Sequence, residues 1–206
     1  MSRIFRTDSP VMRELYRFSS MVILSVLWLV CCIPIITIGA STTALYYATG
    51  KEIQGEGKAV ENFFHSFRMN LKPAMIAELI FWAVGIFLVL DVLVLTGVEM
   101  NGKELVYALL TILLIFSMAL WSYVFPILSH FHCSIGELFR NACMLSVLNL
   151  PSTILVILVN AVPFLLAMWS LGWFFRLVPI LLFVWPGAAA RINSHRFDRI
   201  FRKSCR

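Results

Sequence analysis

The sequence predicts an all-helical protein that crosses a membrane several times, and three observations lead to that fold class. Hydrophobic residues make up 60% of the chain and charged residues only 14%. The mean hydropathy is +0.87, well above the values of soluble globular domains. The apolar residues also fall in long runs, the pattern of transmembrane helices. We therefore expect residues 1–206 to form one transmembrane helix bundle with five long-to-medium hydrophobic segments.

The first of these segments, residues 20–49, contains thirty uncharged residues. As one straight helix it would be about 45 Å long, whereas a bilayer core is about 30 Å thick, and two ordinary spans would need about 40 residues. Pro34 and Gly39 interrupt the segment. We predict a hairpin or a re-entrant loop there, which gives effectively six crossings. Four hydroxyl residues follow Pro34, and they either satisfy backbone groups at the break or line a path for a small solute: Thr37, Ser41, Thr42 and Thr43.

Amphipathic segments flank the apolar runs. A helix over residues 9–19 begins at Ser9-Pro10, a helix-capping pair, and is expected to lie at the membrane surface. A second interfacial helix is predicted over residues 58–72, which end before Pro73. The tail, residues 191–206, alternates aromatic and basic residues, as helices on anionic lipid head groups do. These segments predict contact with the head groups of the cytoplasmic leaflet.

Four further spans follow from the apolar runs, and each is bounded by polar or turn residues. Ser134 and Glu137 have the spacing of a capping box, which predicts a helix start that leads into the third of these spans. The segment Pro186–Ala190 presents small residues that suit close packing against another helix, either of the same bundle or of a partner protein. The expected spans are residues 74–96, 105–129, 146–169 and 173–190.

The basic residues predict the orientation. If residues 20–49 return to the side where they started, fifteen Lys and Arg residues share one face of the membrane and Lys103 stands alone on the other. A single crossing would divide them eleven to five. Because positive charge favours the cytoplasmic side, we expect both termini in the cytoplasm. The net charge of +6 is explained by this distribution and does not indicate nucleic acid binding.

Charged and polar residues inside the predicted spans are candidates for function or for structural pairing. Asp91 and Arg176 lie at similar depths in different spans, which predicts an ion pair. Glu78 and Asn149 share a depth near the cytoplasmic side. Glu78 either reaches the membrane interface or couples to protons or cations in a water-filled cavity.

The sequence lacks the common catalytic and phosphate-binding motifs. It contains no nucleophile elbow, Gly-rich phosphate loop or zincin motif. His130 and His132 precede Cys133, but residues two apart do not share a helical face, so no metal site is predicted. The five cysteines have no CxxC spacing and are expected to be reduced thiols. The sequence therefore predicts a protein that is not an enzyme and has no cofactor.

Four segments together resemble the YesL-like family of small bacterial integral membrane proteins: LWLVCCIPIITIGASTTALYYAT, FFHSFRMNLKPA, YVFPILSHF with ELFRNACMLSVLNLPST, and WPGAAARINSHRFDRIF. The resemblance implies a plasma-membrane protein of unestablished molecular function. It further implies an association with carbohydrate uptake or polysaccharide degradation, and it brings no catalytic residues.

Two function hypotheses follow. The first is a non-enzymatic accessory or regulatory component that associates with a sugar-transport or sensing complex in the bacterial plasma membrane. The second is a small-solute transporter or channel that uses the broken first hairpin, because interrupted helices often surround sites near the membrane midplane. A continuous polar cavity that reaches residues 37–43, Glu78 or Asp91 would distinguish the second hypothesis from the first.

Overall fold

The computed structural model describes residues 10–97, 102–131, 133–169 and 171–204. Every element within these ranges is helical, which confirms the all-helical fold class. The elements in chain order are α1 (Pro10–Cys31), the short 3₁₀ helix η1 (Ile35–Thr37), α2 (Ile38–Gln54), α3 (Ala59–Thr96), α4 (Lys103–His130), α5 (Ile135–Leu148), α6 (Leu150–Trp169), α7 (Leu171–Phe183) and α8 (Trp185–Ser204).

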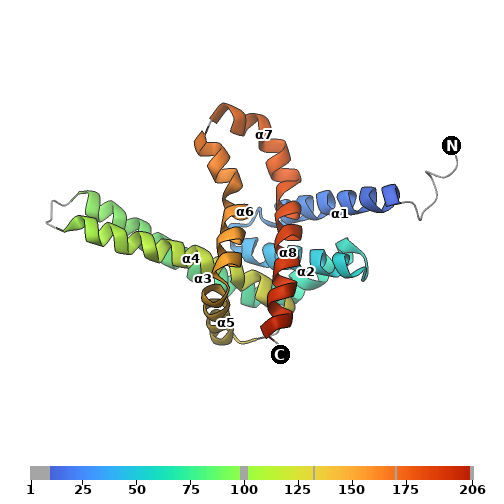
Figure 1. Cartoon of the computed structure of the whole chain (residues 1–206), viewed down its shortest axis with the longest axis horizontal. Helices are drawn as coiled ribbons and strands as arrows, with labels where there is room; N and C mark the ends of the chain where they lie inside the picture. The colour runs from blue at the N-terminus through green and yellow to red at the C-terminus, as the bar shows by residue number, and fades with distance from the viewer. Residues whose placement is uncertain (1–9, 98–101, 132, 170, 205–206) are drawn as a thin grey trace.

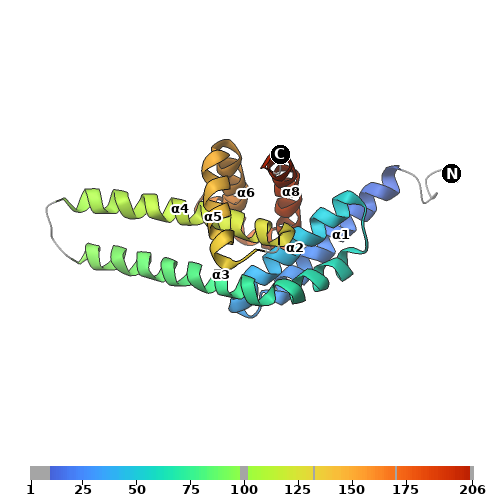
Figure 2. The same ribbon diagram turned by 90° about the horizontal axis from the view of Figure 1, so that it is seen from below.

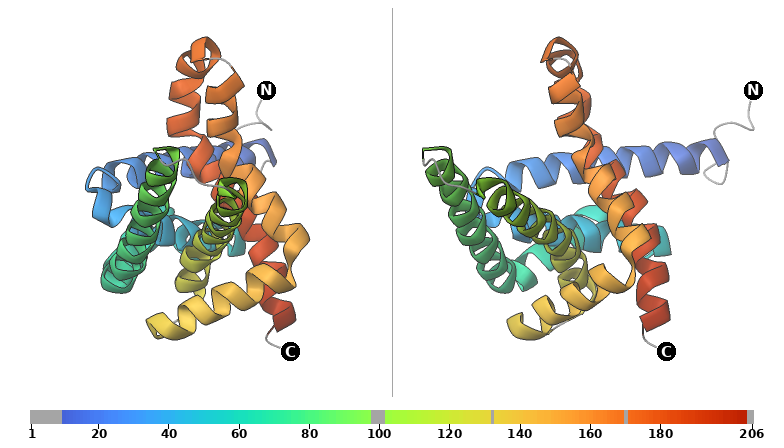
Figure 3. Two further views of the ribbon diagram at one scale, coloured as in Figure 1. Left: turned by 90° about the vertical axis from the view of Figure 1, so that its left-hand side faces the viewer. Right: turned by 60° about the vertical axis from the view of Figure 1, so that its left-hand side comes forward.

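The helices form a packed base from which two arms project (Figure 1). The base contains α1, α2, α8 and the adjoining parts of α3 and α4. The α3–α4 arm, which we define as residues 81–96 and 103–118, continues along the direction of α1 and α2 (Figure 2). The second arm, made by α6 and α7, points in a different direction, as the two views of Figure 3 show.

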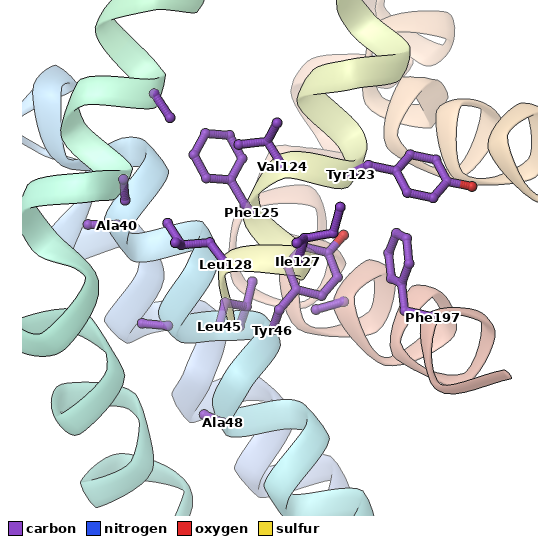
Figure 4. Close-up of a cluster of buried hydrophobic side chains, with 14 of the residues drawn as sticks. Ala40, Leu45, Tyr46, Ala48, Tyr123, Val124, Phe125, Ile127, Leu128 and Phe197 are labelled. Atoms are coloured by element: carbon purple, nitrogen blue, oxygen red, sulfur yellow. The ribbon is translucent and has the colours of Figure 1, made fainter. Parts of the chain in front are cut away.

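The hydrophobic core lies in the base, where α2, α4 and α8 meet. Phe197 of α8 packs edge-on against two tyrosines, Tyr46 of α2 and Tyr123 of α4, with ring centroids 5.9 and 5.2 Å apart. Figure 4 shows these three rings beside Ile127 and Leu128. Phe197 and Tyr123 are fully buried. Because the three rings come from distant parts of the chain, their contact fixes α8 against the first hairpin.

The chain reverses direction between α1 and α2, as the break in residues 20–49 predicts. Thr37 closes this reversal, because its hydroxyl lies 2.6 Å from the Cys31 carbonyl and 2.7 Å from the Pro34 carbonyl. Two residues later, Gly39 lets α2 approach its neighbours closely. A Cβ atom at Gly39 would lie 2.6 Å from the ring of Phe125 and 2.9 Å from the Ala74 carbonyl oxygen. A glycine is therefore required at this position for close packing.

The first and last helices are also in close contact, which confirms the expected packing of the small residues at 186–190. The backbone N–H of Gly187 donates to the Ser25 hydroxyl at 2.9 Å. A Cβ atom at Gly187 would lie 2.6 Å from the carbonyl oxygen of Met21. Further along α8, the Arg191 guanidinium donates to the Glu52 carboxylate of α2 at 3.4 Å. These contacts hold α8 across both helices of the first hairpin.

Two predicted surface helices continue directly into spans. The predicted helix 9–19, whose residue 9 lies outside the described ranges, forms the start of α1, which continues to Cys31. The predicted helix 58–72 and span 74–96 form one helix, α3, with Pro73 inside it. A proline removes a single backbone donor, and the surrounding turns preserve the remaining hydrogen bonds, so the helix continues. The expected boundary at Pro73 is therefore wrong.

The last two predicted spans are divided differently from the expectation. The capping box is confirmed, since Ser134 accepts from Glu137 and the Glu137 carboxylate accepts from the Ser134 backbone. However, Asn149 ends α5, so that the predicted span 146–169 starts at Leu150 instead. The predicted span 173–190 is split at Val184, before Pro186. The tail continues α8 to Ser204, and residues 205–206 lie outside the described ranges.

Three helices in the described ranges are long and apolar enough to cross a membrane: Glu14–Cys31, Ala59–Thr96 and Lys103–His130. The pair Ile135–Leu148 and Leu150–Pro163, bent by 103°, would be a fourth if it forms one broken span. These helices indicate a membrane protein. The expected six crossings are not confirmed, because α2 has only 17 residues and α7 only 13.

Candidate functional site

A polar pocket of about 350 Å³ lies where α2, α3 and α4 meet in the base. Its floor is formed by three buried polar residues, Ser66 and Asn70 of α3 and Ser129 of α4. The Asn70 amide donates to the Ser66 hydroxyl at 3.1 Å. The Ser129 hydroxyl donates to the Pro126 carbonyl at 2.7 Å. Ligand sites in proteins usually carry a few such polar groups, which orient the bound molecule.

The rim of this pocket carries a cation and two aromatic rings. Lys51 of α2 pairs with Glu56 at 2.5 Å, and its ammonium lies 6.0 Å from the centre of the Tyr47 ring. The Glu56 carboxylate raises the pKa of Lys51, so the lysine stays charged. The Tyr47 ring lies 6.2 Å from that of His65 on α3. The rim therefore offers one positive charge and a tyrosine–histidine pair.

His130, the last residue of α4, forms another side of the pocket. Its Nδ1 lies 2.9 Å from the Ser129 hydroxyl and 3.2 Å from the Pro126 carbonyl. The opposite edge of the ring faces α2, because a Cβ atom built on Gly50 would lie 3.9 Å from His130 Cε1 and Nε2. Gly50 thus leaves space beside the histidine, and a larger side chain would fill that space.

A second, apolar cavity of about 790 Å³ lies among α1, α2, α4, α6, α7 and α8. Most of its lining is aliphatic or aromatic, and Thr42, Ser122 and Asn160 are among the few polar residues on its surface. The Trp28 indole donates to the Thr42 hydroxyl at 3.2 Å. Asn160 accepts from the Asn193 amide at 3.4 Å. This cavity is large enough for a drug-sized apolar molecule or a lipid chain.

The two cavities contact different faces of α2. The apolar cavity touches α2 at Ile38, Thr42 and Leu45, whereas the polar pocket touches it at Gly50 and Gln54. At 3.6 residues per turn these two sets lie roughly half a turn apart around the helix axis. Buried residues of α2, Ala44 and Ala48 among them, lie along the helix between the two sites. The cavities are therefore separate sites.

Glu78 is buried in α3, with only 4% of its surface exposed. The indole N–H of Trp121 on α4 donates to its carboxylate at 3.3 Å. Trp82, one turn further along α3, also interacts with this carboxylate. Neither of the two cavities described above is lined by Glu78. The structure thus places Glu78 inside the helix packing and gives it indole partners, and a role in proton coupling stays a prediction.

Asn149 is not brought next to Glu78 by any described hydrogen bond. It ends α5, where its amide donates to the Leu145 carbonyl at 3.2 Å. The neighbouring Thr153 hydroxyl lies 2.9 Å from the Tyr123 hydroxyl and 2.9 Å from the Ser146 carbonyl. Asn149 therefore belongs to the polar network that holds the bend between α5 and α6.

The structure places Asp91 and Arg176 on different arms. Asp91 lies near the end of α3 and Arg176 lies in α7. The end of α3 and the whole of α7 point in different directions from the base (Figures 1 and 3). The ion pair between them was inferred from equal depth in the membrane, and it stays a prediction.

The hydroxyl residues of the first hairpin bond mainly to their own helix. Ser41, Thr42 and Thr43 each donate to the carbonyl four residues earlier, at 2.8 to 2.9 Å. Thr37 bonds carbonyls at the reversal. These bonds favour the backbone-satisfying alternative for this segment, and among the four, only Thr42 is also part of a cavity wall described above.

The cysteines and histidines of the described ranges do not gather into a metal site. No group of three or more His, Cys, Asp or Glu residues in those ranges could hold a metal ion. Cys31, Cys32, Cys133 and Cys143 are free thiols, and Cys205 lies outside the described residues.

The polar pocket was not predicted from the sequence, although the sequence carries an indication of it. Ser66 and Asn70 are four residues apart in α3, on the same face as the buried Phe63 and Ala74. Two polar residues in an otherwise apolar helical stripe indicate a polar site in the core. The contributions of α2 and α4 depend on how the three helices pack.

Comparison with known proteins gives a match to a family model. Residues 21–92 match a family model described as a protein of unknown function, DUF624. The YesL-like proteins belong to that family. The matched part covers the first hairpin and most of α3, including the α2 and α3 sides of the polar pocket, but it ends before α4. No curated protein and no solved structure matches the chain.

Proposed function

We propose that this chain is a non-enzymatic, multi-pass membrane protein that serves as an accessory or regulatory component of a complex for carbohydrate uptake or utilisation. The observation that carries the proposal is the α3–α4 arm. Among its side chains, only Leu88 and Leu110 are buried. Helices that are apolar on all sides need a cover of lipid or of helices from another protein. The kind of complex follows from the YesL-like resemblance.

The proposed location is a bacterial plasma membrane with both termini in the cytoplasm. The distribution of basic residues supports this orientation, since Lys and Arg are enriched in cytoplasmic segments. Anionic lipid head groups are then the expected contact of the basic tail.

Photo-crosslinking in intact cells tests the accessory role. A photoreactive amino acid replaces Phe87 or Ile112, which are 64% and 63% exposed on the arm. As a control, the same amino acid replaces Val124, which is fully buried in the base. We expect the two arm positions to give a covalent adduct with another membrane protein, and the control to give none. Adducts with lipid alone, together with recovery of an unaccompanied monomer from native membranes, would contradict the proposal.

A second candidate function is the transport of a small solute. The apolar cavity supports it, because this space lies against the first hairpin and reaches Thr42. The separation of this cavity from the polar pocket weighs against one continuous path. Flux measurements in proteoliposomes distinguish the two functions. Solute flux that falls when Thr42→Trp fills the cavity would support transport, whereas flux equal to that of protein-free liposomes would exclude it for the solutes measured.

A further inference from the structure

We propose that the pocket between α2, α3 and α4 binds a phosphate group, carried either by a small soluble molecule or by an anionic lipid head group. The proposed accessory role does not require this site, which lies in the base and away from the α3–α4 arm. The two proposals can therefore fail separately.

The pocket is rich in hydrogen-bond donors. The ten described residues that line it include a lysine, two histidines, an asparagine, a glutamine and Ser66, but no carboxylate. The pocket's second serine, Ser129, already donates its hydroxyl hydrogen to the Pro126 carbonyl. On the floor, the Ser66 hydroxyl accepts from Asn70 and so keeps its own hydrogen for a ligand. A phosphate group presents several acceptor oxygens at once, which matches this set of donors.

The two buried polar residues of the floor are not explained by packing alone. Ser66 and Asn70 are 1% and 6% exposed, and they satisfy only part of each other's hydrogen-bonding capacity. Elsewhere on the same face α3 uses Phe63 and Ala74, which pack without polar groups. A polar pair at this place gains more stability when a polar ligand completes its hydrogen bonds.

Lys51 supplies the charge, and a comparison with Lys58 shows how its position differs. Both lysines pair with a nearby glutamate, Lys51 with Glu56 at 2.5 Å and Lys58 with Glu61 at 3.0 Å. The side chain of Lys51 is 34% exposed and lines the pocket, whereas that of Lys58 is 79% exposed. A phosphate in the pocket would therefore compete with Glu56 for the Lys51 ammonium.

The size of the pocket allows more than a bare phosphate. Small-molecule sites have volumes of about 300–1,000 Å³, and this pocket of about 350 Å³ lies at the lower end of that range. It can hold a phosphate with a small organic group attached. The Tyr47 and His65 rings at the rim are suited to contact that group.

Binding measurements on the full chain test the proposal. The protein is placed in nanodiscs of phosphatidylcholine, and inorganic phosphate is titrated by calorimetry against sodium chloride of equal ionic strength. A parallel set of nanodiscs contains phosphatidic acid, and a shift of the melting temperature reports binding of the lipid. Binding of the free ion indicates a soluble ligand, while stabilisation by phosphatidic acid alone assigns the phosphate to a lipid. Binding of neither probe overturns the proposal.

Matched variants distinguish binding in the pocket from a general effect of surface charge. We expect Lys51→Gln to weaken binding of whichever probe binds the unmodified protein, inorganic phosphate or phosphatidic acid. The loss should be about tenfold or more, because a hydrogen bond to a charged group is removed. Glu56→Gln removes the competitor and should strengthen binding about two- to fivefold. Lys58→Gln and Glu61→Gln, the equivalent changes in the exposed pair, should leave the affinity unchanged. Equal losses in Lys51→Gln and Lys58→Gln would overturn the proposal.

Gly50 offers a test that changes no charge. Gly50→Ala places a Cβ atom 3.9 Å from His130, at an ordinary contact distance, and should bind the probe normally. Gly50→Leu extends into the pocket and should abolish binding while the melting temperature without ligand stays close to that of Gly50→Ala. Unchanged binding by a folded Gly50→Leu variant would overturn the proposal.

Discussion

The two halves of α4 have similar apolar sequences but different surroundings. From Lys103 to Met118 only Leu110 is buried, whereas from Ser122 to Ser129 every residue is buried. The inner half also carries polar groups with partners in the protein, such as Tyr123, whose hydroxyl lies 2.9 Å from that of Thr153. The comparison teaches that hydropathy identifies a helix that avoids water, but not whether protein or lipid covers it.

The largest expected effect concerns the inner half. Phe125→Ala removes a fully buried ring from contacts with Phe81 and Trp121 and should lower the free energy of unfolding by about 3–5 kcal/mol. Phe116→Ala, in the outer half, removes a ring that is 39% exposed and should have a much smaller effect. Thermal unfolding in detergent micelles measures both. Equal losses would mean that the two halves are packed alike.

A charge in the outer half tests whether lipid covers it. Ile112→Lys places an ammonium near the middle of the arm helix, where the loss of isoleucine and the gain of a charge together should make membrane insertion less favourable by about 3–4 kcal/mol. Leu105→Lys, near the start of α4, is the control, because a lysine there can extend to the interface. Insertion efficiency in a microsomal glycosylation assay gives the difference. Similar insertion of the two variants would place the arm outside the membrane core.

Close helix contacts should also distinguish the base from the arm. Gly39→Ala introduces a Cβ atom 2.6 Å from the Phe125 ring, and the overpacking should cost about 1–3 kcal/mol. Gly85→Ala in the arm meets no atom within 4 Å and should be neutral or slightly stabilising, because glycine weakens a helix. Melting temperatures in the same detergent compare the two variants. A larger loss in Gly85→Ala would contradict the packing of the base.

The smallest expected effect is local and lies outside both halves of α4. Ser134→Ala removes the hydroxyl that accepts from the Glu137 backbone at the start of α5, at a cost of about 1 kcal/mol. Ser134→Asp keeps an acceptor at this position and should preserve most of the stability. Hydrogen exchange of the first α5 amides measures the change, and no difference between the two variants would show that the cap contributes little.

The sequence was sufficient for the features that depend on nearby residues. Apolar runs predicted the helices, Pro34 and Gly39 predicted the first reversal, and the Ser134 spacing predicted the capping box. Pro73 was misleading, since a single proline did not end α3. Local patterns do not report how strongly tertiary contacts hold a helix together across such a residue.

The candidate site depends on packing between distant parts of the chain, and most of it could not be predicted from the sequence. Depth along a span was the only basis for pairing Asp91 with Arg176, and that pair stays a prediction. The sequence singled out Glu78 but could not supply its partner, Trp121, which is 43 residues away. The polar pocket requires α2, α3 and α4 at once, and its only local trace was the pair Ser66 and Asn70.

The hydrogen bond between Gly187 and Ser25 joins residues 162 positions apart. A ribosome adds about 5–20 residues per second, so α1 is made roughly 8 to 30 s before the helix that completes its packing. During that interval Ser25 and the α1 surface around it cannot meet their final neighbour. The packing of α1 is thus completed only when α8 has been made, and truncation before residue 187 would leave the first helix without its closing contact.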